Sequence, residues 1–121
     1  MQGPCHKIPL DFLISFDLLT LMSFRLLIKA GVYIDRLKRP PRKSLNKVVA
    51  IYGVLGYDLV ISSTYEGTHS AGSLHYDNNA YDILNPPEDK DEILRKIRDS
   101  LGKDFDVIDE SNHIHIEYDP K

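Results

Sequence analysis

The sequence predicts a small α+β domain, with an antiparallel sheet and about three helices. Apolar residues recur at helical spacing in three segments, and short runs rich in β-branched and aromatic residues lie after or between them. Helices and strands do not alternate regularly, as they would in a parallel α/β fold, so α+β is the expected class. The chain has 121 residues, which is close to the size of one domain, and we expect a single core over residues 1–121.

Composition and charge argue against several classes of protein. Hydrophobic residues make up 42% and charged residues 27%, which is typical of a globular protein and not of a disordered one. The formal net charge is −3, whereas a surface that follows nucleic-acid phosphates is usually basic, so we expect no nucleic-acid partner. Cys5 is the single cysteine, which rules out a disulfide within the chain.

Residues 10–34 are the only candidate for a membrane or export segment. Asp17 and Arg25 interrupt their apolar run, and each would cost about 2.5–3.5 kcal/mol near the centre of a bilayer. The acidic residues and the single lysine before the run also fit a secretory signal poorly. We therefore expect a buried amphipathic helix over 10–30, ending near Gly31, in a protein that is cytoplasmic or released without a signal. A membrane or export segment is the alternative.

The middle of the chain begins with a basic turn. Residues 35–43, DRLKRPPRK, are interpreted as a solvated connector, with binding to an anionic surface as the alternative. Ser44 is a candidate N-cap for a second helix that ends at Gly56. Residues 57–62, YDLVIS, have the length and β-branched content of a buried strand, and a polar loop follows over 63–72.

The last part of the chain predicts a strand, a helix and a hairpin. Residues 78–84 form the expected strand, which a pair of prolines stops. The third helix, over 88–101, has acidic residues in its first turn and an apolar stripe made of Ile93, Leu94, Ile97 and Leu101. Residues 105–108 and 113–118 are two closing strands, expected to pair as a hairpin.

Histidines concentrate in the second half, where four of the five lie between residues 69 and 115. In the run HIHIE, the strand period of two places His113, His115 and Glu117 on one face. The two isoleucines face the other way, into the core. An apolar side thus anchors the strand, while the opposite side gathers imidazoles and a carboxylate. A polar strand that simply faces water is the alternative.

A second cluster of ligand-type residues lies in SLHYDNNAYD, where Asp82 follows His75 by seven residues. Imidazole nitrogen and carboxylate oxygen bind zinc at about 2.0–2.2 Å, and a loop followed by a strand can bring both to one point. The alternative is that Asp82 caps a turn and His75 is incidental. Combined with HIHIE, however, two imidazoles and one carboxylate would leave a fourth position open, as in a catalytic zinc site. Asp109 and Glu110 precede HIHIE and can add a carboxylate beside that position.

These two runs carry a resemblance. Residues 73–83, SLHYDNNAYDI, resemble the SxHxxGxAxD signature of zinc D-Ala-D-Ala carboxypeptidases and dipeptidases, and resemble still more closely the SLHYEGRAVDI run of the hedgehog amino-terminal domain. Residues 110–115, ESNHIH, are similar to the hedgehog run ESKAHIH. The resemblance covers residues 57–118, about half the chain, whereas residues 1–45 have no recognised resemblance. It implies a fold of the hedgehog and DD-peptidase kind.

The resemblance also implies a ligand set. One zinc ion per chain would be held by His75, Asp82 and His115. In hedgehog the second histidine of the pair binds the metal, which favours His115 over His113 as the third ligand. The ExxH spacing of the peptidases, matched here by Glu110 and His113, keeps the opposite assignment open.

Catalytic roles are implied in the same way. Glu110 would be the general base, and His113 would stabilise an oxyanion. His69, six residues before His75 as in hedgehog, would be a further substrate-binding histidine of the pocket. Counting residues from the hedgehog acid to its first histidine gives Asp109 as the alternative base.

Two positions depart from the family pattern. Asn78 replaces the motif glycine, and asparagine tolerates left-handed backbone geometry better than most residues. The peptidases usually have SxYR upstream, where the arginine helps to hold substrate, but this chain has Glu66 in that position. The resemblance therefore implies a zinc-dependent peptidase acting on short peptidoglycan peptides, with a non-catalytic, hedgehog-like zinc-binding interaction module as the alternative. A plain α+β domain without metal is the third possibility.

Overall fold

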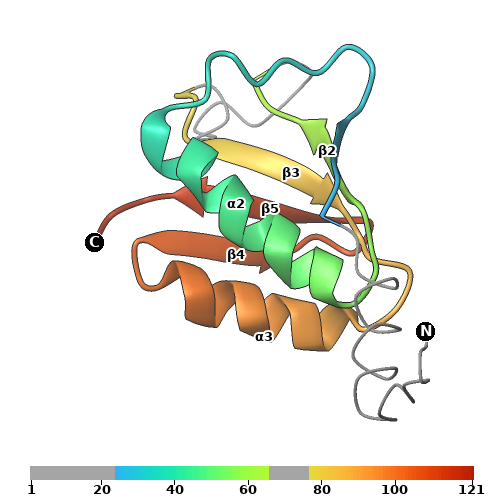
Figure 1. Cartoon of the computed structure of the whole chain (residues 1–121). Helices are drawn as coiled ribbons and strands as arrows, with labels where there is room; N and C mark the ends of the chain where they lie inside the picture. The colour runs from blue at the N-terminus through green and yellow to red at the C-terminus, as the bar shows by residue number, and fades with distance from the viewer. Residues whose placement is uncertain (1–23, 66–76) are drawn as a thin grey trace, which may run out of the picture.

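The computed structural model describes residues 24–65 and 77–121 (Figure 1). Its elements, in chain order, are β1 (Leu26–Ile28), α2 (Arg39–Val54), β2 (Leu59–Ser63), β3 (Ala80–Leu84), α3 (Lys90–Leu101), β4 (Phe105–Asp109) and β5 (His113–Tyr118).

The five strands form one sheet in the order β1-β2-β3-β5-β4. β1 and β2 are parallel, and the other three neighbouring pairs are antiparallel. Both helices lie on the same side of this sheet (Figure 1). The α+β class is therefore confirmed, but the sheet is mixed and not antiparallel as predicted. Two helices lie within residues 24–65 and 77–121, where the sequence predicted about three for the whole chain.

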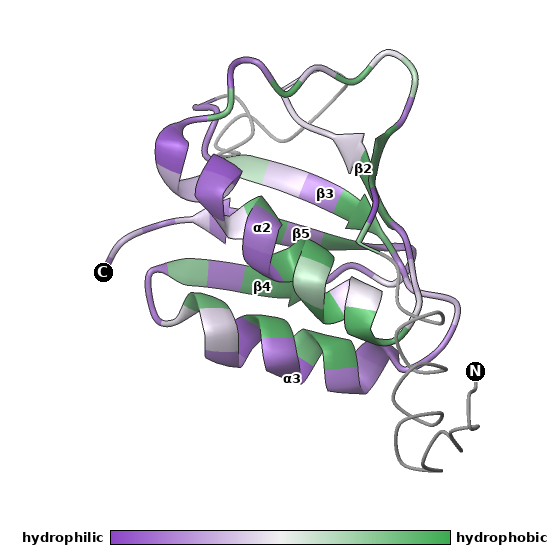
Figure 2. Cartoon of the chain, viewed as in Figure 1, coloured by the Kyte–Doolittle hydropathy of each residue, from purple (hydrophilic) through white to green (hydrophobic). Residues whose placement is uncertain are grey.

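The core lies between the sheet and the two helices. It is built from alternate residues of the strands and from one stripe of each helix, and its fully buried members include Tyr52, Ile61, Tyr81, Ile83, Ile93, Ile97, Ile114 and Ile116. Burying an aliphatic side chain of this size contributes about 1.5–3 kcal/mol, so this layer is the main source of stability. Figure 2 shows that the first turns of α2 are hydrophilic and that its last turns are hydrophobic.

The first described strand corrects a prediction. A helix was expected over 10–30, but Leu26–Ile28 forms β1, parallel to β2, while residues 1–23 lie outside the described residues. The amide of Leu59 donates to the carbonyl of Arg25, and the amide of Lys29 donates to the carbonyl of Ile61, so sheet hydrogen bonds hold both ends of β1. A short apolar run has no periodicity that distinguishes a strand from a helix, and for this reason the sequence predicted a helix here.

α2 begins earlier than predicted. Ser44 was the expected N-cap, yet the helix starts at Arg39 and includes Pro40 and Pro41 in its first turn, where the missing amide hydrogens would have had no helical partner. Ser44 is instead buried within the helix, and its hydroxyl lies 2.6 Å from that of Tyr81. Residues 35–43 are thus only partly a connector. With β1 and β2, α2 also forms one strand–helix–strand unit, which the sequence patterns did not predict.

The second half of the described chain agrees closely with prediction. α3 buries Ile93, Leu94 and Ile97, and Leu101 packs against the core from its last turn. β4 and β5 form the expected hairpin, whose tight end is closed by the amide of Glu110 donating to the carbonyl of His113 at 3.0 Å. Asn78 has a positive φ of 62°, consistent with the left-handed turn that the glycine of the motif would provide. Within the described ranges, no helix is both long and apolar enough to span a bilayer.

Candidate metal centre

The strands β3 and β5 present two different faces. In the register, Asp82 lies opposite His115, and Leu84 lies opposite His113, so these side chains share one side of the sheet. We call this side, which is opposite to α2 and α3, the histidine face, and define it by Asp82, His113, His115 and Glu117. The isoleucines between them on β5 are fully buried on the other side, which we call the helix face.

Asp82 and His115 meet at the centre of the histidine face. Oδ1 of Asp82 lies 2.9 Å from Nδ1 of His115, and only 7% and 9% of the two residues is exposed. They are separated by 33 residues in sequence and are brought together because β3 and β5 are neighbours in the sheet. A carboxylate buried this deeply is costly unless a cation or a hydrogen-bond donor lies against it, and the imidazole fills that role here.

Glu117 contacts the other nitrogen of the His115 ring. Its Oε1 lies 2.6 Å from Nε2 of His115, so both ring nitrogens of His115 face carboxylates. Burial lowers the pKa of His115, but hydrogen bonds to Asp82 and Glu117 and the charges of both groups outweigh it, and the net effect is a raised pKa. The sequence placed Glu117 on this face without a role. The spacing of two residues along a strand indicated that the two side chains share a face, but not that they are in contact.

His113 borders the same carboxylate. Its Nε2 lies 3.6 Å from Oδ2 of Asp82, and its Nδ1 lies 2.6 Å from the side-chain oxygen of Asn112. The two oxygens of Asp82 therefore face two different histidines. The side chain of His113 is 29% exposed against 11% for His115, so His113 lies towards the rim of the site and His115 towards its interior.

The spacing and chemistry of these atoms suit zinc. Two ligand atoms about 2.0–2.1 Å from a tetrahedral ion lie about 3.3 Å apart. The atoms of Asp82 and His115 that face each other are 2.9 Å apart, close to that separation, so both could reach one ion if it replaced the hydrogen between them. Carboxylate and imidazole both occur as zinc ligands, and the same two donors also bind other divalent metals. His75, the remaining predicted ligand, and His69, the predicted substrate-binding histidine, lie outside the described residues.

The two candidate bases face opposite sides of the sheet. Asp109 pairs with Ile114 and so lies on the helix face, where its carboxylate is 2.5 Å from the ammonium of Lys90. The hydrogen bond from Lys90 is the largest cause of the lowered pKa of Asp109. Glu110 closes the hairpin opposite His113, and this pairing puts it on the histidine face, where it is exposed. Of the two, only Glu110 falls on the side of the sheet that carries the histidines, by continuation of the hairpin register.

An acidic cluster adjoins the histidine face. Carboxylate oxygens of Asp106, Glu117 and Asp119 lie within 4.8 Å of one another, a spacing that can hold a cation. The ammonium of Lys121 lies 3.2 Å from Asp106 and 3.7 Å from Asp119 and offsets part of this charge. The cluster contains no imidazole and differs in chemistry from the Asp82–His115 pair.

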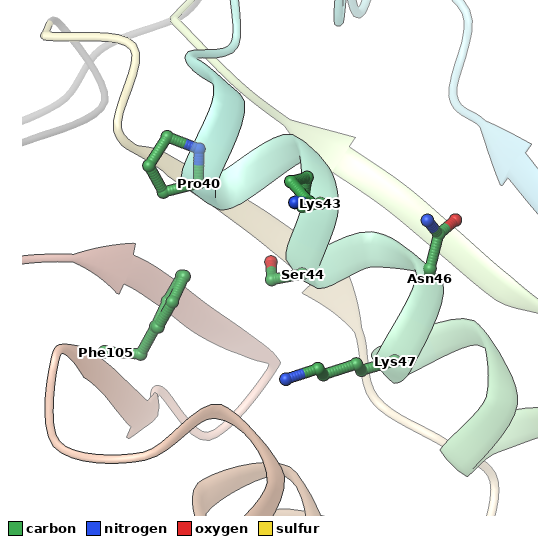
Figure 3. Close-up of a pocket in the computed structure, with 6 residues that line it drawn as sticks. All are labelled: Pro40, Lys43, Ser44, Asn46, Lys47 and Phe105. Carbon is green, nitrogen blue, oxygen red and sulfur yellow. The ribbon is translucent and has the colours of Figure 1, made fainter.

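A hollow of about 420 Å³ lies elsewhere, between the first turns of α2 and the start of β4 (Figure 3). Lys43 and Lys47 project from successive turns of α2, and Phe105 faces them from β4. No predicted site residue lines this hollow, whose walls are Pro40, Lys43, Ser44, Asn46, Lys47 and Phe105. It is therefore separate from the histidine face.

No family model, curated protein or solved structure matches this chain. The functional assignment therefore depends on the geometry of the histidine face and on the two sequence motifs that lead to it.

Proposed function

We propose that this chain is a zinc-dependent, peptidase-like domain of the hedgehog and DD-peptidase fold that hydrolyses short peptidoglycan peptides. The observation that carries the proposal is the buried contact between Asp82 and His115, whose facing atoms are 2.9 Å apart. These residues belong to two separate motifs, and the resemblance implies both as ligands of one zinc ion. Their convergence on one point supports that implication. His75 would complete the set of three.

Each remaining residue then has a distinct task. A bound zinc ion would supply a Lewis acid that polarises a peptide carbonyl and lowers the pKa of a water molecule. Glu110, exposed at the end of the hairpin, would take a proton from the attacking water and return it to the leaving amine. His113, at the rim of the site, would donate a hydrogen bond to the oxyanion. His69 would line the pocket that holds the peptide.

The preferred peptide follows from one substitution. Glu66 stands where the peptidases have an arginine that holds the substrate carboxylate. A negative side chain there would repel a free terminal carboxylate, so internal or amidated peptides should be better substrates than peptides with a free C-terminus. The same substitution favours the second candidate function, a hedgehog-like module that binds zinc and a partner without cleavage.

Metal analysis followed by a peptide-release assay tests the proposal. Purified wild-type protein should hold about one zinc ion per chain, His115→Ala should lose it, and His113→Ala should retain it while losing activity. Zinc-loaded wild type should release fragments from peptidoglycan peptides. A protein that binds no zinc would remove the proposal altogether. Zinc binding without release from blocked or free peptides would leave the interaction module.

A further inference from the structure

Glu117 is the one member of the histidine face to which the motifs assign no role. It follows His115 by two residues on β5, and the strand period places both side chains on the same face. Its Oε1 lies 2.6 Å from Nε2 of His115, while Oδ1 of Asp82 lies 2.9 Å from Nδ1. The imidazole is therefore held at both nitrogens, by carboxylates from two strands.

The two contacts would respond differently to a metal. An ionised carboxylate only accepts hydrogen bonds, so without metal each contact needs a hydrogen on the ring nitrogen that faces it. A metal held by Asp82 would replace the hydrogen on Nδ1, the nitrogen that faces Asp82, and would leave the hydrogen on Nε2 for Glu117. Histidines that bind metals usually donate their other ring N–H to a carboxylate or a carbonyl, which fixes the orientation and tautomer of the ring.

We propose that Glu117 is the positioning residue of the candidate metal centre, holding the ring of His115 so that Nδ1 is the metal donor. This inference rests on the proposed function, because it assigns Glu117 a task in the same zinc site. Asp82 and His115 are the ligands, and Glu117 acts on the metal only through the ring.

The surroundings of Glu117 favour this role over a purely electrostatic one. Its side chain is 18% exposed, whereas that of Asp106, its cross-strand neighbour on β4, is 38% exposed. In the part of the chain that the structure describes, His115 is the one basic group paired with Glu117, while Lys121 pairs with Asp106 and Asp119. Glu117 is thus the member of the acidic cluster that contacts the histidine, while Asp106 and Asp119 pair with the lysine.

Zinc affinity, measured by competition with a chelator, provides the test. Glu117→Ala should bind zinc about 10–100-fold more weakly than wild type, the usual effect of removing such a partner. Glu117→Gln retains an oxygen that can accept from Nε2, so it should recover part of this loss. Asp106→Asn is the matched control, since it removes a neighbouring carboxylate without touching His115, and its affinity should stay within about threefold of wild type.

Nitrogen NMR of the His115 ring supplies a readout that loss of packing alone would not change. In zinc-loaded wild type the proton should be on Nε2 and the metal on Nδ1. In Glu117→Ala the Nε2 proton loses its acceptor, so its signal should broaden or disappear through faster exchange with water, or the metal should be found on either nitrogen. Circular dichroism tests whether each variant is folded. If Glu117→Ala is unfolded, the NMR spectrum and zinc affinity of Glu117→Gln decide whether Glu117 is the positioning residue.

The outcomes separate the two proposals. If wild type binds zinc but the Glu117 variants bind it as tightly as Asp106→Asn, or if the metal is found on Nε2, Glu117 is not the positioning residue and the zinc site stands. If wild type binds no zinc, the proposed function fails and this inference fails with it.

Discussion

The two faces of strands β3 and β5 are built from alternating residues of the same short segments, yet they have opposite chemistry. Ile114 and Ile116 on the helix face are fully buried among aliphatic and aromatic side chains. Asp82 and His115 on the histidine face are nearly as buried, at 7% and 9% exposed, but they are polar and face each other. Burial alone therefore does not distinguish the faces, and the kind of group buried does.

The difference shows which face stability explains. Apolar burial on the helix face contributes about 1.5–3 kcal/mol for each large side chain. A buried ion pair is often no better for stability than apolar residues of similar volume, because desolvation offsets the attraction between the charges. Stability therefore gives no reason to place a carboxylate and an imidazole at the centre of the sheet. Binding of a ligand that contacts both groups would give such a reason, and this is why the histidine face is the candidate site.

The sharpest way to test the comparison uses adjacent residues that face opposite sides of the sheet. Glu110→Gln should retain zinc, because Glu110 is not among the proposed ligands, and should lower turnover by about 10²–10⁴-fold, the usual share of general-base catalysis. Asp109→Asn should have a much milder effect, since Asp109 is paired with Lys90 on the helix face. Peptide release and zinc content are measured on the same samples. A larger loss from Asp109→Asn would reverse the assignment of the base.

A change on the helix face should act on stability and leave the metal alone. Ile116→Ala removes a fully buried side chain from the core and should lower the free energy of unfolding by about 2–5 kcal/mol. The loss should be the same with chelator and with zinc in urea denaturation. If Ile116→Ala also abolished the stabilisation by zinc, the two faces would not be independent.

Zinc itself should stabilise the histidine face. Free zinc at 100 times its dissociation constant should raise the free energy of unfolding of wild type by about 2.7 kcal/mol. His115→Ala should show no such increase, and His113→Ala should retain it. Unfolding is followed by circular dichroism in matched zinc and chelator buffers. The opposite pattern for the two histidines would make His113 the third ligand.

The smallest predicted effect concerns the pH dependence of the free energy of unfolding, which should have opposite signs with and without zinc. Without metal, the pKa of His115 is raised above its ordinary value of 6.5, so its contribution to stability is complete below that value. The contribution is then lost as the pH rises through the raised pKa. Zinc requires the unprotonated ring, so stabilisation by zinc should increase over the same range. Denaturation at several pH values, with chelator and with zinc, should give opposite slopes. Parallel slopes would exclude His115 as a ligand.

Sequence patterns found the parts of this protein in which alternation or helical period is strong. The run HIHIE fixed the two faces of β5, and the stripe of Ile93, Leu94 and Ile97 fixed the buried side of α3. Local patterns failed where pairing with a distant segment decides the structure. β1 is a strand because β2 lies beside it. The start of α2 was missed for a local reason, since the double proline fits the first turn and leaves Ser44 inside the helix.

The candidate site was predictable to a similar extent. The motifs named Asp82 and His115, but the sequence does not show that β3 and β5 are neighbours, which is what places the two residues in contact. Nor did it show that Asp109 and Glu110 separate to opposite faces, because that depends on the register of the β4–β5 hairpin. The contact between Glu117 and His115 depends on side-chain orientation, which residue spacing alone does not fix.

The strand order has a consequence for synthesis of the chain. β5 lies between β3 and β4 in the sheet but follows both in sequence, so β3 and β4 leave the ribosome before the strand that joins them. At about 5–20 residues per second, the 33 residues from Asp82 to His115 take about 2–7 seconds to make. During that interval β3 carries an open edge towards the missing strand. A nascent chain is thus exposed to wrong pairing until the HIHIE segment emerges.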